Sequence, residues 1–364
     1  MGAILDFSSI TPPCGAIEDI RKMLFEDVLR SPALNTYFKV MPNTYSGDRA
    51  GYIGSFGLMG VACQGCSPEY DDAVIPLSEK VWEVNCWEIA LTMCYEPLMN
   101  TMLRYALNNG VRISDLVESG EISQVYFNDI ILRRLEEAIR ELVFRMAWFG
   151  DKDAANVSGG GIIKDGTDVK YFNWTDGFWK RILALVSANA DRRTVIAANA
   201  EATIAAQKAA MWTPGKAIET LDALIEAAPL KLRGADSQVI FMTQAFKDAY
   251  DRDVRETYKG CCFDNGWKLM FEGLAETTYN GRTLVVLPTM DMTIQAYEGD
   301  GVKWNNPFRL VYTTRDNLLI GTNADGEIQR VDYWWERKER MNYVVASDTM
   351  GTMIADDELI QVAY

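Results

Sequence analysis

Histidine is absent from this sequence of 364 residues. Catalytic triads, zinc sites with histidine ligands and imidazole proton shuttles are therefore excluded. An enzyme built from this chain would have to work with carboxylates, lysine, tyrosine or cysteine. Because no catalytic motif made of these residues stands out, we predict that the protein is not an enzyme. We expect no catalytic residues, no cofactor, no cofactor-binding residues and no metal ligands.

Basic residues are also fewer than acidic residues. The chain has 36 Lys and Arg against 51 Asp and Glu, which gives a formal net charge of -15. A protein that binds nucleic acid without regard to sequence needs a basic surface that displaces counterions from phosphates. Tight DNA binding is therefore not expected. Net negative charge suits a protein that encloses DNA without adhering to it, because like charges repel.

Long hydrophobic runs are missing as well. No stretch reaches the roughly 18 consecutive apolar residues of a membrane-spanning helix. The start, Met1-Gly2-Ala3-Ile4, has no basic segment followed by an apolar block, so it does not read as a signal peptide. We predict neither a membrane span nor export.

Two short motifs could carry a redox, metal-binding or nucleotide-binding function. The seven cysteines include Cys63-Gln64-Gly65-Cys66, the one pair with redox or metal spacing. Cys86 and Cys94 would have to complete a four-thiolate site, but they are separated by more residues than zinc sites usually allow. We interpret these thiols as small apolar side chains in a reducing cytoplasm. Gly159-Gly160-Gly161 follows a predicted helix and lacks a Lys-Ser/Thr sequence, so we interpret it as a flexible connection.

The first half of the chain predicts an extended arm, a long two-stranded hairpin loop and a long helix. Residues 16–29 form a short amphipathic pattern after an irregular start. Residues 41–90 contain no helical pattern, and their second part is rich in β-branched and aromatic residues. An isolated hairpin is marginally stable in water. We therefore expect this hairpin loop to lie on a neighbouring copy of the chain.

The strongest helical pattern runs from about Ser123 to Trp148. Its apolar residues recur every three or four positions, at Phe127, Ile131, Leu135, Ala138, Leu142 and Met146. Some 24 helical residues at a rise of 1.5 Å would span about 36 Å. Gly150 is expected to end this helix, and a second helix is expected over 174–186.

The second half predicts an α/β unit followed by strands. After a boundary near Met211, a helix is expected to about residue 228, a strand over 238–242, and a helix opened by Thr243. Asn280-Gly281 predicts a turn into a buried strand over 282–288. Residues 309–313 and 318–322 then predict a hairpin, residues 327–346 further strand, and residues 356–364 a short final strand.

This order of elements resembles the Hong Kong 97-type capsid fold of tailed bacteriophages. Several stretches are also similar to capsid proteins of phages that infect gut bacteria, namely Lys80-Val81-Trp82 through Trp87-Glu88-Ile89, Asn306 to Tyr312, Asn317 to Thr322, and Glu358 to Tyr364.

The resemblance implies an α+β fold with four named parts. Residues 1–40 would be the N-terminal arm with its short helix, and 41–90 the E-loop. Residues 91–204 would be the P-domain with its spine helix at about 123–148, and 205–300 the α/β A-domain. Residues 301–364 would return strands to the P-domain and end in the C-terminal tail.

The resemblance also implies the function of a major capsid protein. Copies would assemble into pentamers and hexamers of an icosahedral head that encloses double-stranded DNA, in the virion, after assembly in the bacterial cytoplasm. Scaffolding, portal and decoration or cement proteins are the expected partners besides the chain itself. One branch of the family joins subunits through Lys-Asn isopeptide bonds. Here Lys80 and Asn342 are the residues to consider, although no spacing rule connects them.

Three alternatives remain open at this point. The same fold would serve an encapsulin-like shell around a cargo enzyme. Another virion component, such as a tail or portal protein, would form a ring of single symmetry. A carboxylate-based enzyme such as a glycosidase would use the abundant aromatic and acidic residues, and it would need a deep pocket with paired carboxylates of raised pKa.

Overall fold

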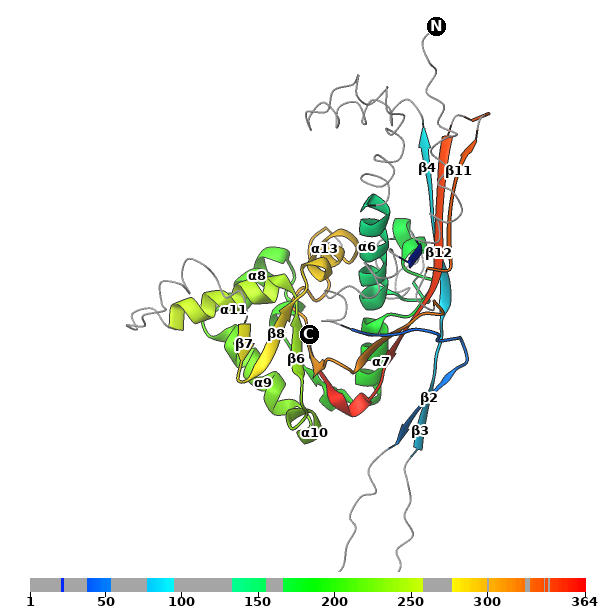
Figure 1. Ribbon diagram of the computed structural model, residues 1–364. Helices are drawn as coiled ribbons and strands as arrows, with labels where there is room; N and C mark the ends of the chain where they lie inside the picture. Colours follow the sequence, from blue (N-terminus) through cyan, green and yellow to red (C-terminus); the bar gives the residue numbers. More distant parts are fainter. Residues whose placement is uncertain are drawn as a thin grey trace, which may run out of the picture.

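The computed structural model describes the chain in separate stretches. They are residues 21–22, 38–53, 77–94, 133–154, 166–257, 277–299, 301–324, 328–336, 338–339 and 341–364. Figure 1 shows an upright group of long strands beside helix α6, an α/β unit to the left, and a hairpin that projects below.

The first sheet is built around one very long strand. Its order is β1-β10-β12-β11, and β4 also pairs with β12. Residues 341–350 of β12 pair with β4, residues 341–347 with β11 and residues 351–354 with β10. The bounds are β1 (Lys39–Met41), β4 (Asn85–Cys94), β10 (Leu318–Gly321), β11 (Arg330–Glu336) and β12 (Met341–Ile354). We call β4, β11 and residues 341–347 of β12 the arm.

Helix α6 (Arg133–Phe149) stands against one face of the arm (Figure 1). Its buried side chains recur at helical spacing and share a core with residues of β4 and β12; among them are Leu135, Ile139, Leu142, Val143 and Met146. The opposite face carries the ion pairs Arg134–Glu137 and Arg140–Glu136. The helix predicted over 123–148 is confirmed from Arg133 onward, and residues 123–132 lie outside the described residues. Helix α7 (Phe178–Ala188) follows where the second helix was expected.

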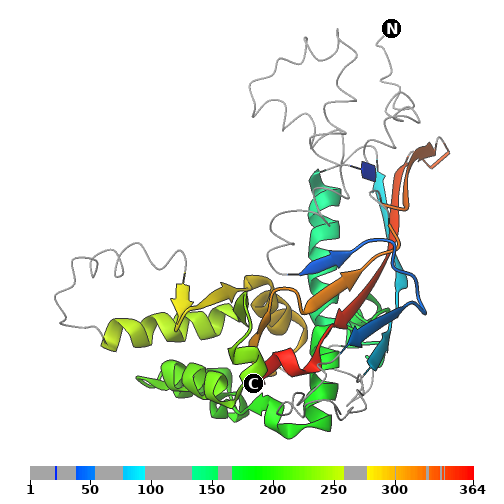
Figure 2. The same cartoon turned by 60° about the horizontal axis from the view of Figure 1, so that its bottom comes forward.

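The α/β unit is organised by a six-stranded sheet of order β5-β13-β9-β6-β8-β7 (Figure 2). The bounds of its strands are β5 (Arg193–Thr194), β6 (Gln238–Met242), β7 (Thr277–Tyr279), β8 (Arg282–Val286), β9 (Leu310–Thr314) and β13 (Ile360–Ala363). Its helices are α8 (Ile204–Met211), α9 (Lys216–Ala227), α10 (Leu230–Arg233), α11 (Gln244–Thr257) and α13 (Pro288–Tyr297). Short 3-10 helices are Gly166–Tyr171, Ala190–Arg192, Ala197–Ala200 and Asp357–Leu359.

This sheet separates two hydrophobic cores. Along β6, Val239 and Phe241 face the core that contains α6 and α7, whereas Ile240 and Met242 face the core that contains α9 and α11. Successive residues of a strand point to opposite faces, so a strand buried on both faces reads as a continuous apolar run. That is why residues 238–242 were recognisable as a strand.

Several local predictions are confirmed at residue level. Strand β6 occupies 238–242, and α11 begins one residue after Thr243. Between β7 and β8, Asn280 and Gly281 both have positive φ angles, of 49° and 78°. Two consecutive residues of this kind form the turn that matches the twist of a two-stranded hairpin.

One prediction about the C-terminal strands is wrong. β9 and β10 lie where the hairpin was expected, but they do not pair with each other. β9 is flanked by β6 and β13, and β10 is flanked by β1 and β12. Both edges of each strand are therefore already occupied. Among the strands after residue 301, β9 and β13 belong to the α/β sheet, whereas β10, β11 and β12 belong to the first sheet.

The boundaries expected at residues 90 and 204 fall at regular elements. Residue 90 lies inside β4, which pairs with β12 along its whole length, and Ile204 is the first residue of α8. Within the ribbon expected over 41–90, the described residues pair as β2 (Arg49–Ile53) and β3 (Leu77–Val81), and residues 54–76 lie outside the described residues. No helix in the described parts of the chain is long and apolar enough to cross a membrane.

A buried ion pair lies at the junction of the two sheets. Arg309, just before β9, pairs with Glu298, just after α13, and the two side chains are 4% and 0% exposed. The guanidinium also donates to the carbonyl oxygens of Asn305 and Asn306. It lies 5.0 Å from the centre of the Trp179 ring on α7. This cluster joins the α/β unit to the helices behind the arm.

Candidate functional site

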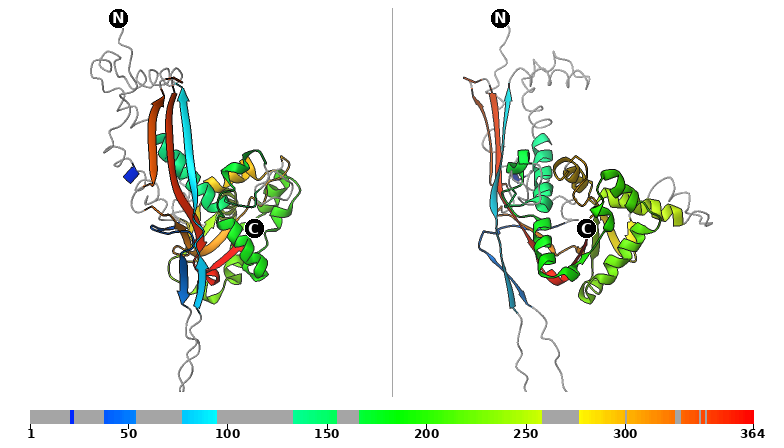
Figure 3. Two further views of the ribbon diagram at one scale, coloured as in Figure 1. Left: turned by 90° about the vertical axis from the view of Figure 1, so that its right-hand side faces the viewer. Right: turned by 180° about the vertical axis from the view of Figure 1, so that it is seen from behind.

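The β2–β3 hairpin is held firmly at its base. Lys80 Nζ lies 2.5 Å from Asp357 Oδ1 and donates to the carbonyl oxygen of Ile354 at 2.7 Å. The hairpin is thereby tied to the end of β12. In Figures 1 and 3 it points away from the arm, on the opposite side of the molecule.

Trp82 fills the space behind this base. Its side chain is 5% exposed, and a Cβ placed on Gly321 would lie 2.7 Å from the Trp82 ring. The backbone of Trp82 is also fixed, because its N–H donates to Asp48 and its carbonyl accepts from Gly47. The direction in which the hairpin leaves the body is therefore set by packing and hydrogen bonds together.

We call the contacts that fix the base of the hairpin the clamp. Gly351→Ala on β12 tests it. The added Cβ would lie 2.3 Å from the carbonyl oxygen of Glu83, between β3 and β4, so backbone must move. We expect the variant to lose about 1–3 kcal/mol of unfolding free energy, as overpacked sites do, measured by denaturant unfolding. The matched control is Gly51→Ala on β2, whose new Cβ meets nothing within 4 Å. Equal stability of the two variants would contradict the clamp.

The arm presents a second face that points away from α6. Tyr343, Val345 and Ser347 of β12 are half-buried there, and Ala90 of β4 is exposed. Trp334 on β11 stacks on Tyr343, with ring centres 5.2 Å apart and an angle of 6° between the planes. The left panel of Figure 3 views this side of the arm. We call it the outer face of the arm.

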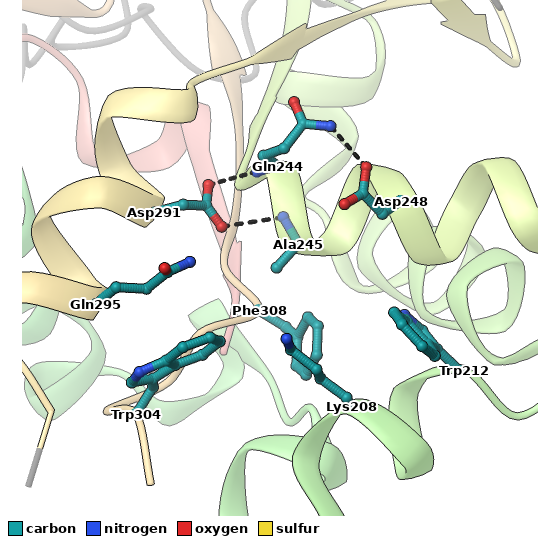
Figure 4. Close-up of a pocket in the computed structure, with 9 residues that line it drawn as sticks. All are labelled: Lys208, Trp212, Gln244, Ala245, Asp248, Asp291, Gln295, Trp304 and Phe308. Carbon is teal, nitrogen blue, oxygen red and sulfur yellow. Dashed lines mark hydrogen bonds between the residues drawn. The ribbon is translucent and has the colours of Figure 1, made fainter. Parts of the chain in front are cut away.

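A small pocket lies in the α/β unit (Figure 4). It is lined by side chains from α8, α11, α13 and the segment before β9: Lys208, Trp212, Gln244, Ala245, Asp248, Asp291, Gln295, Trp304 and Phe308. The ammonium of Lys208 lies 5.0 Å from the centre of the Trp304 ring. The volume of the pocket is about 140 Å³, below the roughly 300–1,000 Å³ of common ligand sites.

The two carboxylates of this pocket provide the test of the glycosidase alternative. Burial raises the pKa of the Asp291 carboxyl, against the backbone hydrogen bonds that favour its ionised form. Its oxygens accept the N–H groups of Gln244 at 2.5 Å and Ala245 at 3.0 Å, at the start of α11. Asp248 accepts the side-chain amide of Gln244 at 2.7 Å. Asp291 therefore serves as a cap of α11, with one backbone N–H group bound to each of its carboxylate oxygens.

The thiols considered for a metal site do not come together. Cys86 and Cys94 both lie on β4, eight residues apart on one continuous strand. At about 3.3 Å per residue they are about 26 Å apart, so one ion cannot bind both. Cys63, Cys66 and the Gly159–Gly161 triplet lie outside the described residues. Within the described stretches, no three or more Cys, Asp or Glu side chains are placed to hold a metal ion.

Lys80 and Asn342 are far apart within one chain. Lys80 contacts Ile354, and Asn342 lies twelve residues earlier on the same strand. Twelve strand residues span about 40 Å. A covalent bond between these two residues would have to join different copies of the chain.

Comparison with known proteins gives structural matches without sequence matches. No family model and no curated protein sequence matches the chain. The satellite phage P4 procapsid including size determination (Sid) protein matches with a TM-score of 0.50 and 12% identity, covering 95% of this chain and 97% of that chain. Cyanophage Pam1 capsid asymmetric unit gives 0.48, 14%, 90% and 88%, and Gordonia phage Cozz gives 0.47, 11%, 90% and 84%.

The first of these matches carries the structural conclusion, because it extends over nearly the full length of both chains. The described elements of this chain include a hairpin, a long helix behind an arm of strands, and an α/β unit. This chain therefore has the Hong Kong 97-type capsid fold, as its sequence implied.

Proposed function

We propose that this protein is the major capsid subunit of a tailed bacteriophage and assembles into the icosahedral head. The observation that carries the proposal is the likeness to the procapsid chain of satellite phage P4 over 95% of this chain. A structural role also fits the pocket of the α/β unit, where Asp291 caps α11 and Asp248 accepts the side-chain amide of Gln244.

In this proposal each part of the chain has an assembly role. Residues 1–40 act as the N-terminal arm and residues 41–90, built on the β2–β3 hairpin, as the E-loop. Helix α6 and the strands around β12 form the P-domain. The unit around the six-stranded sheet forms the A-domain, which meets its copies around five-fold and six-fold axes.

The outer face of the arm is the proposed contact for the hairpin of a neighbouring copy. That hairpin has a fixed direction at its base, through Lys80 and Trp82. It therefore reaches the next subunit at low cost in conformational entropy. The outer face offers stacked aromatic rings and half-buried Val345. Aromatic residues are enriched in such contacts.

The shell would enclose double-stranded DNA in the virion. The net charge of -15 favours a lining that does not adhere to DNA. Assembly in the bacterial cytoplasm, and contacts with scaffolding, portal and decoration or cement proteins, belong to the same proposal.

Sedimentation of the purified full chain at micromolar concentration tests this function. We expect species of hexamer and pentamer size together with much larger shells. Nuclease-protected DNA inside particles purified from infected cells would distinguish a phage head from an encapsulin-like shell, which would contain a cargo enzyme. A single monomeric species at every concentration would contradict both.

A further inference from the structure

Asp348 occupies a special place on β12. The residues before it, up to Ser347, pair with β11, and those from Gly351 onward pair with β10. It therefore lies at the junction between the arm and the lower strands β1 and β10. Its register partner on β4 is Trp87, an uncharged and buried residue.

The carboxyl group of Asp348 is fully buried and only partly hydrogen-bonded. Oδ1 accepts the N–H of Thr349 at 2.7 Å and the hydroxyl of Thr322 at 3.4 Å. Within the described stretches, Oδ2 has no hydrogen-bond partner. A buried carboxylate in this state is costly, because neither water nor protein compensates its charge fully.

Among the residues that the structure describes, few charged groups surround this carboxyl. Arg21 is held nearby, because its guanidinium donates to the carbonyls of Ile328 and Gln329 before β11, and its positive charge favours ionised Asp348. On α7, Arg181 donates to Thr352, four residues further along β12. The nearby residues of β4 and of the segment after β10, Trp87, Thr322 and Asn323, carry no charge.

Burial dominates this balance and raises the pKa of Asp348 to about 7, against the two hydrogen bonds and Arg21. The neighbouring contacts depend on the same geometry. The N–H of Asn323 donates to Thr349 Oγ1 at 2.9 Å, and the N–H of Ala324 donates to Thr322 Oγ1 at 3.1 Å. Any movement that brings water to Asp348 would break these bonds.

We propose that Asp348 is a protonation switch at this junction, and that its ionisation opens the contact between β12 and residues 322–324. The arm is then held rigidly on the lower strands while Asp348 is neutral, and less rigidly once the proton has left. The inference concerns the fold of one chain and goes beyond the proposed role in a shell.

The sign follows from linkage. An aspartate in water has an ordinary pKa of 3.8, so the opened state loses its proton at lower pH than the closed state. Between these two values, opening becomes more favourable as the pH rises. From pH 5.5 to pH 8 the opening equilibrium constant should increase about 30-fold.

Hydrogen exchange of the full-length protein tests the switch. Backbone amides of residues 322–324 and 349–351 are followed by mass spectrometry at pH 5.5 and pH 8, with rates corrected for the intrinsic pH dependence of exchange. We expect protection to fall about 30-fold in these two segments at the higher pH, and protection in β6 to stay unchanged.

Variants separate this carboxyl from other causes. Asp348→Asn keeps the shape without the titration, so its protection should be independent of pH. Asp332→Asn, the same change of charge on β11 of the same sheet, should behave like the wild type. Arg21→Gln removes the favourable positive charge and should move the midpoint to higher pH. Should Asp348→Asn fail to fold, the wild-type profile decides. A flat wild-type profile, or a pH dependence that persists in Asp348→Asn, would overturn the proposal.

Discussion

Replacing residues 54–76 with Asn-Gly is expected to abolish shell assembly while the subunit still folds. Ile53 and Leu77 are register partners at the ends of β2 and β3, so a two-residue turn of this type closes the hairpin without changing its register. The base keeps its clamp through Lys80 and Trp82. Only the part proposed to reach a neighbouring copy is removed.

The measurement pairs particle yield by electron microscopy with thermal unfolding. We expect no closed shells and an unfolding temperature close to that of the wild type. Gly51→Ala, a small change in the same hairpin with open space around it, is the control and should assemble normally. Normal shells from the shortened chain would show that the hairpin does not carry assembly.

Arg309→Leu is expected to cost about 3–5 kcal/mol of unfolding free energy, the usual effect of removing one partner of a buried ion pair. The substitution leaves the carboxylate of Glu298 in the interior without its guanidinium. It also removes the contact with the Trp179 ring and the hydrogen bonds to Asn305 and Asn306. The junction between the two sheets should therefore weaken.

Denaturant unfolding of three variants tests this explanation. Arg315→Leu, which changes an exposed arginine in the turn after β9, should cost less than about 0.5 kcal/mol. The double variant Arg309→Leu with Glu298→Leu should recover most of the loss, because no buried charge remains. If the double variant were as unstable as the single one, the ion pair would not be the cause.

The sequence predicted those elements whose signals are local. The apolar run at 238–242, Thr243 before α11 and the Asn280-Gly281 turn each depend on a few neighbouring residues. The structure confirms all three. Helix α6 likewise follows from apolar residues at helical spacing.

The pairing of strands was less accessible, because it depends on partners far away in sequence. Residues 309–322 have the pattern of a hairpin, yet β9 and β10 each find better-placed partners on both edges. β4 and β12 are separated by some 250 residues, and no short pattern in either strand announces that they pair.

The features that position the candidate site were also invisible to sequence reasoning. Lys80 and Asp357 are joined across 277 positions. Asp348 looks like one more surface acid in an acidic chain until its burial is known. Gly321 and Gly351 are needed because a Cβ at these positions would collide with the side chain of Trp82 and the backbone of Glu83, respectively.

The most direct test of the central claim is electron microscopy of the purified full-length chain. We expect hollow icosahedral shells, or pentamer and hexamer rings, in which the hairpin of one copy lies on the outer face of the next copy's arm. A compact monomer at high concentration, or a ring of a single symmetry that never closes into a shell, would contradict it.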